Sequence, residues 1–177
     1  MNKLILVILF IFAAKFNAYS QSYIDAGGIR IGSGEFGVTY KRLLQNKWTI
    51  EGIASQSFKD RNKDLIVSVL GERHYPVLSR RLNIYFGGGI QAQFLGLKSD
   101  PNLSNGAGIA GIAGLEFTIN RLNISYDIKP ALYLIGGRSD FDSQVALSLR
   151  YVFTKRSINI DWSKLKFWEG WFKKKDN

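Results

Sequence analysis

Apolar and polar residues alternate along most of this chain, in segments of about ten residues that turn-forming residues separate. Successive side chains of a β-strand point to opposite faces, so the alternation predicts strands with one apolar and one polar face. No helical period is sustained between Gln21 and Phe153. Eight segments carry the strand pattern: Tyr23–Gly32, Phe36–Leu44, Trp48–Phe58, Leu65–Val77, Leu82–Gly96, Gly106–Ile119, Leu122–Leu134 and Val145–Phe153.

The segment Val145–Phe153 illustrates how the two faces differ. Its odd-numbered positions are all large and apolar, whereas the opposite face carries Ser148 and Arg150. Strands that alternate in this way from one segment to the next are typical of membrane-spanning barrels. We therefore predict an all-β fold, an eight-stranded antiparallel up-and-down transmembrane β-barrel over residues 21–153. A soluble β-sandwich also alternates and stays open as the alternative fold.

The lengths of the connections predict which end of the barrel faces the periplasm. Outer-membrane barrels have short periplasmic turns and longer external loops. Three connections between predicted strands are short: Gln45–Lys47, Leu78–Arg81 and Asn120–Arg121. Three of the alternate connections are longer and polar: Lys59–Asp64, Leu97–Asn105 and Ile135–Gln144. The short turns and both chain ends are therefore expected on the periplasmic side.

The N-terminus carries the pattern of an export signal. Lys3 precedes the apolar run Leu4–Ala14, and Ala18–Ser20 supplies small residues at the positions that signal peptidase reads. The run is too short for a membrane-spanning helix, which needs about 20 residues. We therefore predict a signal peptide over residues 1–20, cleaved after Ser20, and export of the barrel to the cell outer membrane.

Composition narrows the chemistry that the chain can perform. The 177 residues include no cysteine and one histidine, and the formal net charge is +10. The absence of cysteine excludes disulfides, thiolate metal sites and cysteine nucleophiles, and a single histidine excludes a histidine-rich zinc site. A basic balance alone would suggest nucleic acid or an anionic membrane surface. Since an exported chain does not normally meet nucleic acid, the membrane surface is the expected partner.

Strand parity sorts the charged residues into those that face the lumen and those that face outward. Arg30 points inward only if Gly27 and Gly28 form a bulge, and Arg42 and Arg73 fall on the outward face near the periplasmic ends, within reach of headgroups. The predicted lumen network comprises Arg30, Lys41, Glu51, Glu72, His74, Glu116, Asp127, Lys129 and Arg150.

The predicted lumen charges balance, with four cations against four carboxylates. A three-residue turn that places Leu44 opposite Trp48 also places Lys41 opposite Glu51. Buried charges must be paired, and eight strands enclose an interior just wide enough for side chains. We therefore expect a charge-paired plug, with room for the long residues made by the inward glycines Gly87, Gly89, Gly108 and Gly114. A gated channel is the alternative.

Two motifs that suggest chemistry have simpler explanations. The segment Gly106–Gly111 matches the dinucleotide-binding spacing, but no helix is predicted after it. His74 and Glu72 share one face and invite an acid–base interpretation. Some eight-stranded outer-membrane barrels modify lipid A at the outer leaflet, whereas His74 falls near the predicted periplasmic end. No catalytic residue, cofactor or metal is predicted.

Several segments together resemble a known family. The chain is similar to the small eight-stranded outer-membrane β-barrels of the OmpA/OmpX type, and closest to a group of uncharacterised exported barrels. The segments that carry this resemblance are Ile29–Gly32, Gly37–Lys41, Glu51–Ile53, Tyr85–Gly89, Gly111–Glu116, Asp127–Ala131 and Ala146–Phe153. Tyr151 and Phe153 resemble the final-strand signal of such barrels, which implies insertion by the barrel assembly machinery.

The chain departs from that family in its C-terminal tail, residues 154–177. Asp161 could cap a helix, and the composition of aromatic residues flanked by lysines predicts an amphipathic interfacial helix. A docking segment for another protein and a disordered basic tail are the alternatives. The predicted contact residues of the tail are Trp162, Leu165, Phe167, Trp168, Trp171, Phe172, Lys173, Lys174 and Lys175.

These patterns predict a non-enzymatic integral outer-membrane barrel with a plugged lumen, acting as a structural or interaction module. Its expected partners are outer-membrane lipid and the barrel assembly machinery. The main alternative is an accessory subunit of an outer-membrane assembly or secretion complex, docked on an outer-membrane or periplasmic protein through its tail. A lipid A-modifying enzyme and a small gated channel are further alternatives.

Overall fold

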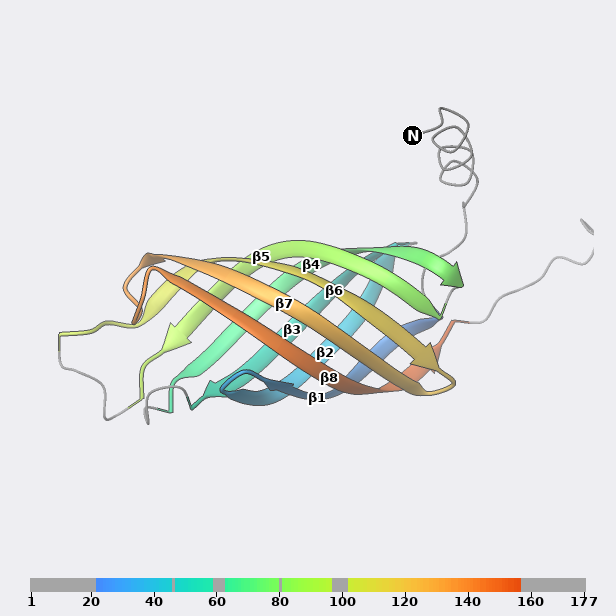
Figure 1. Cartoon of the computed structure of the whole chain (residues 1–177), viewed down its shortest axis with the longest axis horizontal. Helices are drawn as coiled ribbons and strands as arrows, with labels where there is room; N and C mark the ends of the chain where they lie inside the picture. Colours follow the sequence, from blue (N-terminus) through green and yellow to red (C-terminus); the bar gives the residue numbers. More distant parts are fainter. Residues whose placement is uncertain (1–21, 46, 59–62, 80, 97–101, 157–177) are drawn as a thin grey trace, which may run out of the picture.

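Eight antiparallel strands close into a single barrel (Figure 1). The computed structural model describes residues 22–45, 47–58, 63–79, 81–96 and 102–156. Each strand pairs with its neighbours in sequence, and the first strand pairs with the last. The strands are β1 Tyr23–Gly32, β2 Glu35–Gln45, β3 Trp48–Ser57, β4 Leu65–Ser79, β5 Leu82–Phe94, β6 Gly106–Ile119, β7 Leu122–Ile135 and β8 Phe141–Lys155.

The predicted all-β, eight-stranded antiparallel barrel is confirmed, and the strand boundaries differ in detail. The largest difference is in β8, which begins at Phe141 rather than Val145 and ends at Lys155 rather than Phe153. At its start, Phe141 of β8 pairs with Leu132 of β7, and at its end Lys155 pairs with Tyr23 of β1. The predicted boundary of the tail at residue 154 therefore falls inside a strand. The signal peptide and the helix predicted after Asp161 lie outside the described residues.

Two local predictions of register are wrong. The register of β1 against β8 shifts between Tyr23 and Ala26, not at Gly27 and Gly28. The two shifts cancel in the pairing of β1 with β8, but Tyr23 and Ala26, three residues apart, are both buried. The alternation of β1 therefore changes between these two residues, and Arg30 falls on the inner face with Ala26. In the turn between β2 and β3, Trp48 pairs with Gln45 rather than Leu44, and a register shift after Leu43 restores the predicted pairing downstream.

The barrel has two ends that differ in what they carry. β1 begins and β8 ends at one end, together with the short β2–β3, β4–β5 and β6–β7 turns, and we call it the terminal end (Figure 1). The other four connections lie at the opposite end, which we call the loop end. This division follows from an up-and-down topology with an even number of strands.

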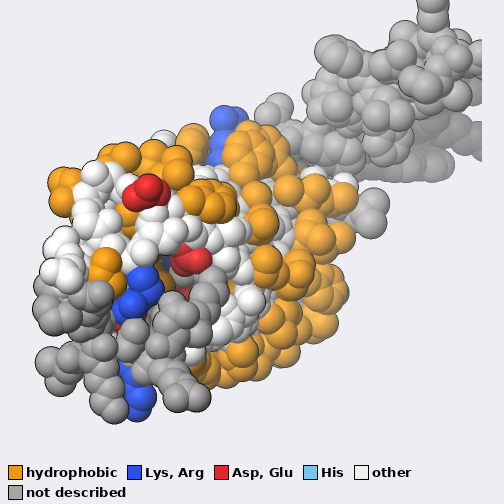
Figure 2. Space-filling view, turned by 60° about the vertical axis from the view of Figure 1, so that its left-hand side comes forward, with side chains coloured by type: hydrophobic (Ala, Val, Ile, Leu, Met, Phe, Trp, Pro, Cys, Tyr) orange, Lys and Arg blue, Asp and Glu red, His pale blue; other side chains and the backbone are white. Residues whose placement is uncertain are grey.

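The distribution of polarity is the reverse of that in a water-soluble domain. Among the described residues, 31 large hydrophobic side chains are exposed on the wall, while the buried set holds 23 polar or charged residues and 12 hydrophobic ones. Figure 2 shows hydrophobic side chains spread over the wall and charged side chains gathered at the mouth of the loop end. Within the described ranges, no helix is long and apolar enough to cross a membrane.

Candidate functional site

The barrel interior is the candidate site, because it gathers charged side chains from strands far apart in sequence. All nine residues of the predicted lumen network are at most 1% exposed. They come from every strand except β5. Since buried charges are costly unless paired, the contacts among them decide what the interior can do.

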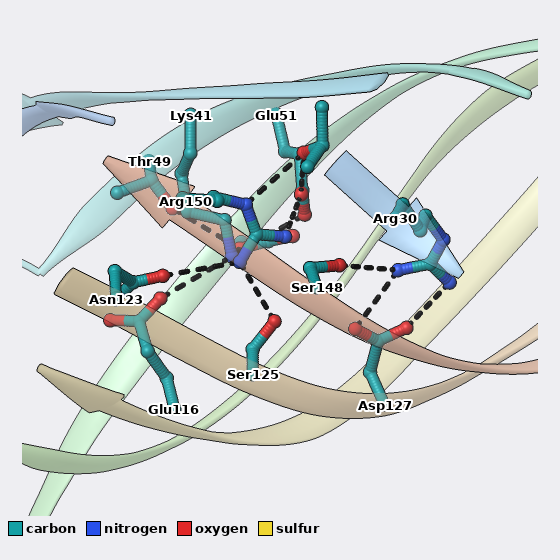
Figure 3. Close-up of polar contacts among 12 residues, drawn as sticks. Arg30, Lys41, Thr49, Glu51, Glu116, Asn123, Ser125, Asp127, Ser148 and Arg150 are labelled. Carbon is teal, nitrogen blue, oxygen red and sulfur yellow. Dashed lines mark hydrogen bonds and ion pairs between the residues drawn. The ribbon is translucent and has the colours of Figure 1, made fainter. Parts of the chain in front are cut away.

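Arg150 of β8 is fully buried, and dashed contacts join it to several polar side chains in Figure 3. Its guanidinium donates to Ser125 Oγ at 2.7 Å, and to Asn123 Oδ1 and Thr39 Oγ1 at 3.2 Å each. It also forms an ion pair with Glu51 of β3. The side chain therefore bonds to residues of three other strands, and these contacts hold it in one position.

Lys41 of β2 lies beside this group and meets three carboxylates. Its Nζ is 2.7 Å from Glu72, 3.3 Å from Glu51 and 3.6 Å from Glu116. The ammonium also lies 4.1 Å from the centre of the Tyr85 ring, a cation–π distance. The predicted pairing of Lys41 with Glu51 is observed both in the strand register and between the side chains.

His74 completes this cluster. Its Nε2 lies 2.9 Å from Thr49 Oγ1 and 3.2 Å from Glu72 Oε2, and its ring stacks on Tyr85 at 5.1 Å between centroids. Nδ1 lies 3.8 Å from Glu116 Oε1. The cluster holds three carboxylates but only two permanent cations. One further proton, on the imidazole or on a carboxylate, therefore makes the cluster neutral.

A second cluster surrounds Arg30 of β1. Its two terminal nitrogens bind both oxygens of Asp127, at 3.0 and 2.6 Å, a two-pronged geometry that is strong and directional (Figure 3). Nη1 also lies 3.4 Å from Ser148 Oγ, and Nε lies 3.4 Å from Glu35. Tyr85 donates to Asp127 at 2.8 Å, so one ring links the two clusters.

Lys129 departs from the expected pairing of charges. Its Nζ donates to Gln91 Oε1 at 2.8 Å and to Ser68 Oγ at 2.9 Å. Among the residues that the structure describes, no carboxylate lies within ion-pair distance of this ammonium. Seven of the nine predicted residues thus share ion pairs, His74 lies within hydrogen-bond distance of Glu72, and Lys129 is held by neutral oxygens.

Sequence reasoning missed several residues that take part. Glu35 is buried and accepts a hydrogen bond from Ser55 at 2.8 Å, although the pattern placed it in a turn. The turn before it is tighter than expected: Gly34 has φ 79° and Gly32 pairs directly with Glu35. Extending the parity from Lys41 back to Glu35 would have found it. Tyr23 donates to Glu116 at 2.8 Å, which the alternation alone did not indicate.

At the loop end, one ion pair joins three connections. Arg138 binds both oxygens of Asp64 at 2.9 and 3.0 Å, and Asp64 also accepts from the backbone N–H of Gly96 and the amide of Gln93. Burial alone would raise the pKa of Asp64. The bonds from Arg138 and Gly96 outweigh it and lower the pKa below its ordinary value. The pair therefore stays charged at neutral pH.

The other predicted positions are on the outer wall or outside the described residues. Tyr151 and Phe153 are exposed on the outer face of β8, with their rings edge to face at 5.7 Å. The predicted contact residues of the tail, from Trp162 onward, lie outside the described residues. In the described part of the chain, no three or more His, Asp or Glu side chains are arranged so that they could hold a metal ion. The arrangement offers an interior cross-linked by charge, and an apolar wall.

Comparison with known proteins bears on the fold. No protein-family model and no curated protein match the sequence. The N-terminal β-barrel domain of Pseudomonas aeruginosa OprF matches with a TM-score of 0.59 at 14% identity, covering 75% of this chain and 98% of that one. The chain has the fold of the small eight-stranded outer-membrane barrels. Neisserial surface protein A is also similar, with a TM-score of 0.50, 10% identity and coverage of 73% and 94%.

Proposed function

We propose that this chain is a non-enzymatic integral outer-membrane barrel with a plugged interior, which acts as a structural or interaction module. The observation that carries the proposal is the inverted distribution of polarity, with large apolar side chains on the outer wall and ion pairs inside. An apolar wall is stable in lipid and costly in water. The fold shared with outer-membrane barrels supports the same location.

The ion-paired interior supports a plug rather than a pore. Arg150, Lys41 and Arg30 cross the interior to reach carboxylates on other strands. An eight-stranded barrel leaves space for little more than its own side chains. Ions would have to displace these pairs in order to pass.

The environment of the single histidine supports a non-enzymatic role. A general base needs hydrogen-bond reach to a substrate proton. His74 is fully buried, and its contacts are to Thr49, Glu72 and Tyr85 within the interior. It therefore contributes to the plug.

The proposal includes a route to the membrane. The signal peptide of residues 1–20, cleaved after Ser20, directs export, and Tyr151 with Phe153 at the end of β8 serves as the signal for the barrel assembly machinery. The exposed positions of both rings on the last strand suit recognition by another protein.

The plug predicts that the purified barrel does not conduct ions. Reconstituted in planar bilayers, it should give no stable conductance step, with a large porin as the positive control. Folding of the same sample is checked by the difference in its migration between unheated and heated gel samples. Steady steps of nanosiemens order from the folded protein would overturn the plug and favour a gated channel.

A second candidate function is an accessory subunit held in an outer-membrane complex through the tail. The observation that favours it is the sequence after Arg156, which combines three tryptophans with five lysines in a short segment. Buried tryptophans are frequent anchors of protein interfaces.

Deleting residues 157–177 tests this candidate without shortening β8, which ends at Lys155. If the tail docks on a protein, affinity purification from native membranes should lose its partners on deletion. Replacing Lys173, Lys174 and Lys175 by glutamine should leave protein partners in place but weaken binding to anionic vesicles. Identical partners with and without the tail would contradict this role.

A further inference from the structure

The terminal end of the barrel carries an excess of positive charge outside the lumen. The cations there are Arg42, Lys47, Arg73, Arg81, Arg121, Lys155 and Arg156. Among the described residues at that end, the acid outside the lumen is Asp25, which lies 3.7 Å from Arg42. The described loop-end residues that flank the strands are nearly balanced, with Lys63 and Arg138 against Asp64, Asp140 and Asp142.

Arg73 of β4 lies among aromatic rings on the outer wall. Its guanidinium carbon is 5.6 Å from the centre of the Trp48 ring and 5.3 Å from that of Tyr75. Trp48 is the cross-strand partner of Arg73, and Tyr75 stacks in turn on Phe86 at 5.1 Å. Two strands therefore hold one exposed cation against the wall.

Arg121, in the turn between β6 and β7, repeats this arrangement. Its guanidinium carbon lies 5.8 Å from the centre of the Tyr151 ring, and its Nη1 donates to Tyr151 Oη at 2.8 Å. Phe153 packs edge to face against Tyr151. Neither Arg73 nor Arg121 pairs with a carboxylate of the described residues.

The chemistry of these two sites suits a lipid phosphate. Contact with an aromatic ring leaves guanidinium N–H groups free to bind an anion, and two parallel N–H groups match two phosphate oxygens. Tryptophan and tyrosine on a barrel wall mark the depth of the headgroups. The positive charge of the terminal end favours lipids that carry net negative charge.

We propose that Arg73 and Arg121, each laid against its aromatic neighbours, form two binding sites for the phosphate of anionic phospholipids of the phosphatidylglycerol class. The lipids belong to the leaflet at the terminal end of the barrel. The inference rests on the proposed membrane location. It goes further because it names the wall residues that bind the lipid phosphate and assigns a preference for anionic lipids to the terminal end.

Native mass spectrometry of the full chain in micelles tests the proposal, using phosphatidylglycerol and phosphatidylcholine with the same acyl chains at equal concentration. The native protein should retain phosphatidylglycerol in preference. Arg73→Gln and Arg121→Gln should each lower that preference about fivefold, as expected for one basic side chain at an anionic surface. Lys63→Gln, with the same change of charge at the loop end, should leave it unchanged.

Further variants separate the sites from net charge and from the membrane location. Arg73→Lys keeps the charge but loses the two-pronged donor, and Trp48→Leu keeps Arg73 but removes a ring, so both should lower the preference. The tail is present in every sample and contributes equally. Equal retention of the two lipids by the native protein, or an equal effect of Lys63→Gln and Arg73→Gln, would overturn the sites. Failure to insert into lipid vesicles of either composition would instead overturn the membrane location.

Discussion

Replacing Arg150 by methionine should lower the free energy of unfolding of the barrel by about 3–5 kcal/mol, as expected when one partner of a buried ion pair is removed. The change leaves the Glu51 carboxylate buried without its guanidinium partner. It also removes the donor to Ser125, Asn123 and Thr39. Urea titration of the protein in lipid vesicles, followed by tryptophan fluorescence, measures the loss.

Arg42→Met is the matched control, because its side chain is 59% exposed and its ion pair with Asp25 is long, at 3.7 Å. Such surface pairs contribute about 0–1 kcal/mol. Combining Arg150→Met with Glu51→Gln should recover part of the stability, since it removes the carboxylate that Arg150 neutralised. If Arg150→Met costs no more than Arg42→Met, water solvates the interior and the plug is refuted.

The alternation of side chains was sufficient to predict the strands and their closure into a barrel. Period two fixes the face of each side chain, and seven of the eight lumen charges, those from Lys41 onward, followed from it without further assumption. The pairing of Lys41 with Glu51 was also predicted, but from a turn in which Leu44 faces Trp48. The observed turn pairs Gln45 with Trp48, and the shift after Leu43 compensates for the difference.

The irregularity of β1 could not be placed from the sequence. A pair of glycines is a common site of a bulge, and Gly27–Gly28 was the local signal available. The observed shift between Tyr23 and Ala26 arises where β1 meets β8, a strand more than a hundred residues away. The alternation of side chains showed that β1 needs one irregularity for Arg30 to point inward. The position of that irregularity depends on the distant partner strand.

The pairing of lumen charges also depends on distances that the sequence does not contain. Parity placed Arg30 and Asp127 on the inner face, and the closure of the barrel brings their side chains together across 97 positions. The same geometry leaves Lys129 with Gln91 and Ser68 instead of a carboxylate. A count of inward charges therefore predicts near-neutrality, while the partners follow from the stagger of the strands.

Gly89→Ala should destabilise the barrel by about 3 kcal/mol or prevent its folding, as expected when a side chain is forced into a closely packed site. The sequence suggested that the inward glycines make room for long side chains. This holds in part for Gly114, whose Cβ would lie 2.6 Å from Asp127 Cβ and from the carbonyl oxygen of Tyr126, and 2.9 Å from the Tyr85 ring. Gly89 has a different role. A Cβ there would lie 2.0 Å from the carbonyl oxygen of Val69 and 2.9 Å from Leu70 Cα, both backbone atoms of β4.

Gly52→Ala is the control for this substitution, because it adds the same methyl group to another strand where nothing lies within 4 Å. Without a clash, alanine should leave stability unchanged or raise it slightly by restricting the unfolded chain. The urea titration used for Arg150→Met compares the two variants, and unheated gels report whether each folds. The backbone of β4 cannot move aside as a flexible side chain can. The loss of stability caused by Gly89→Ala therefore measures how closely β4 and β5 approach. Equal stability of the two variants would contradict the close approach of β4 and β5 at Gly89.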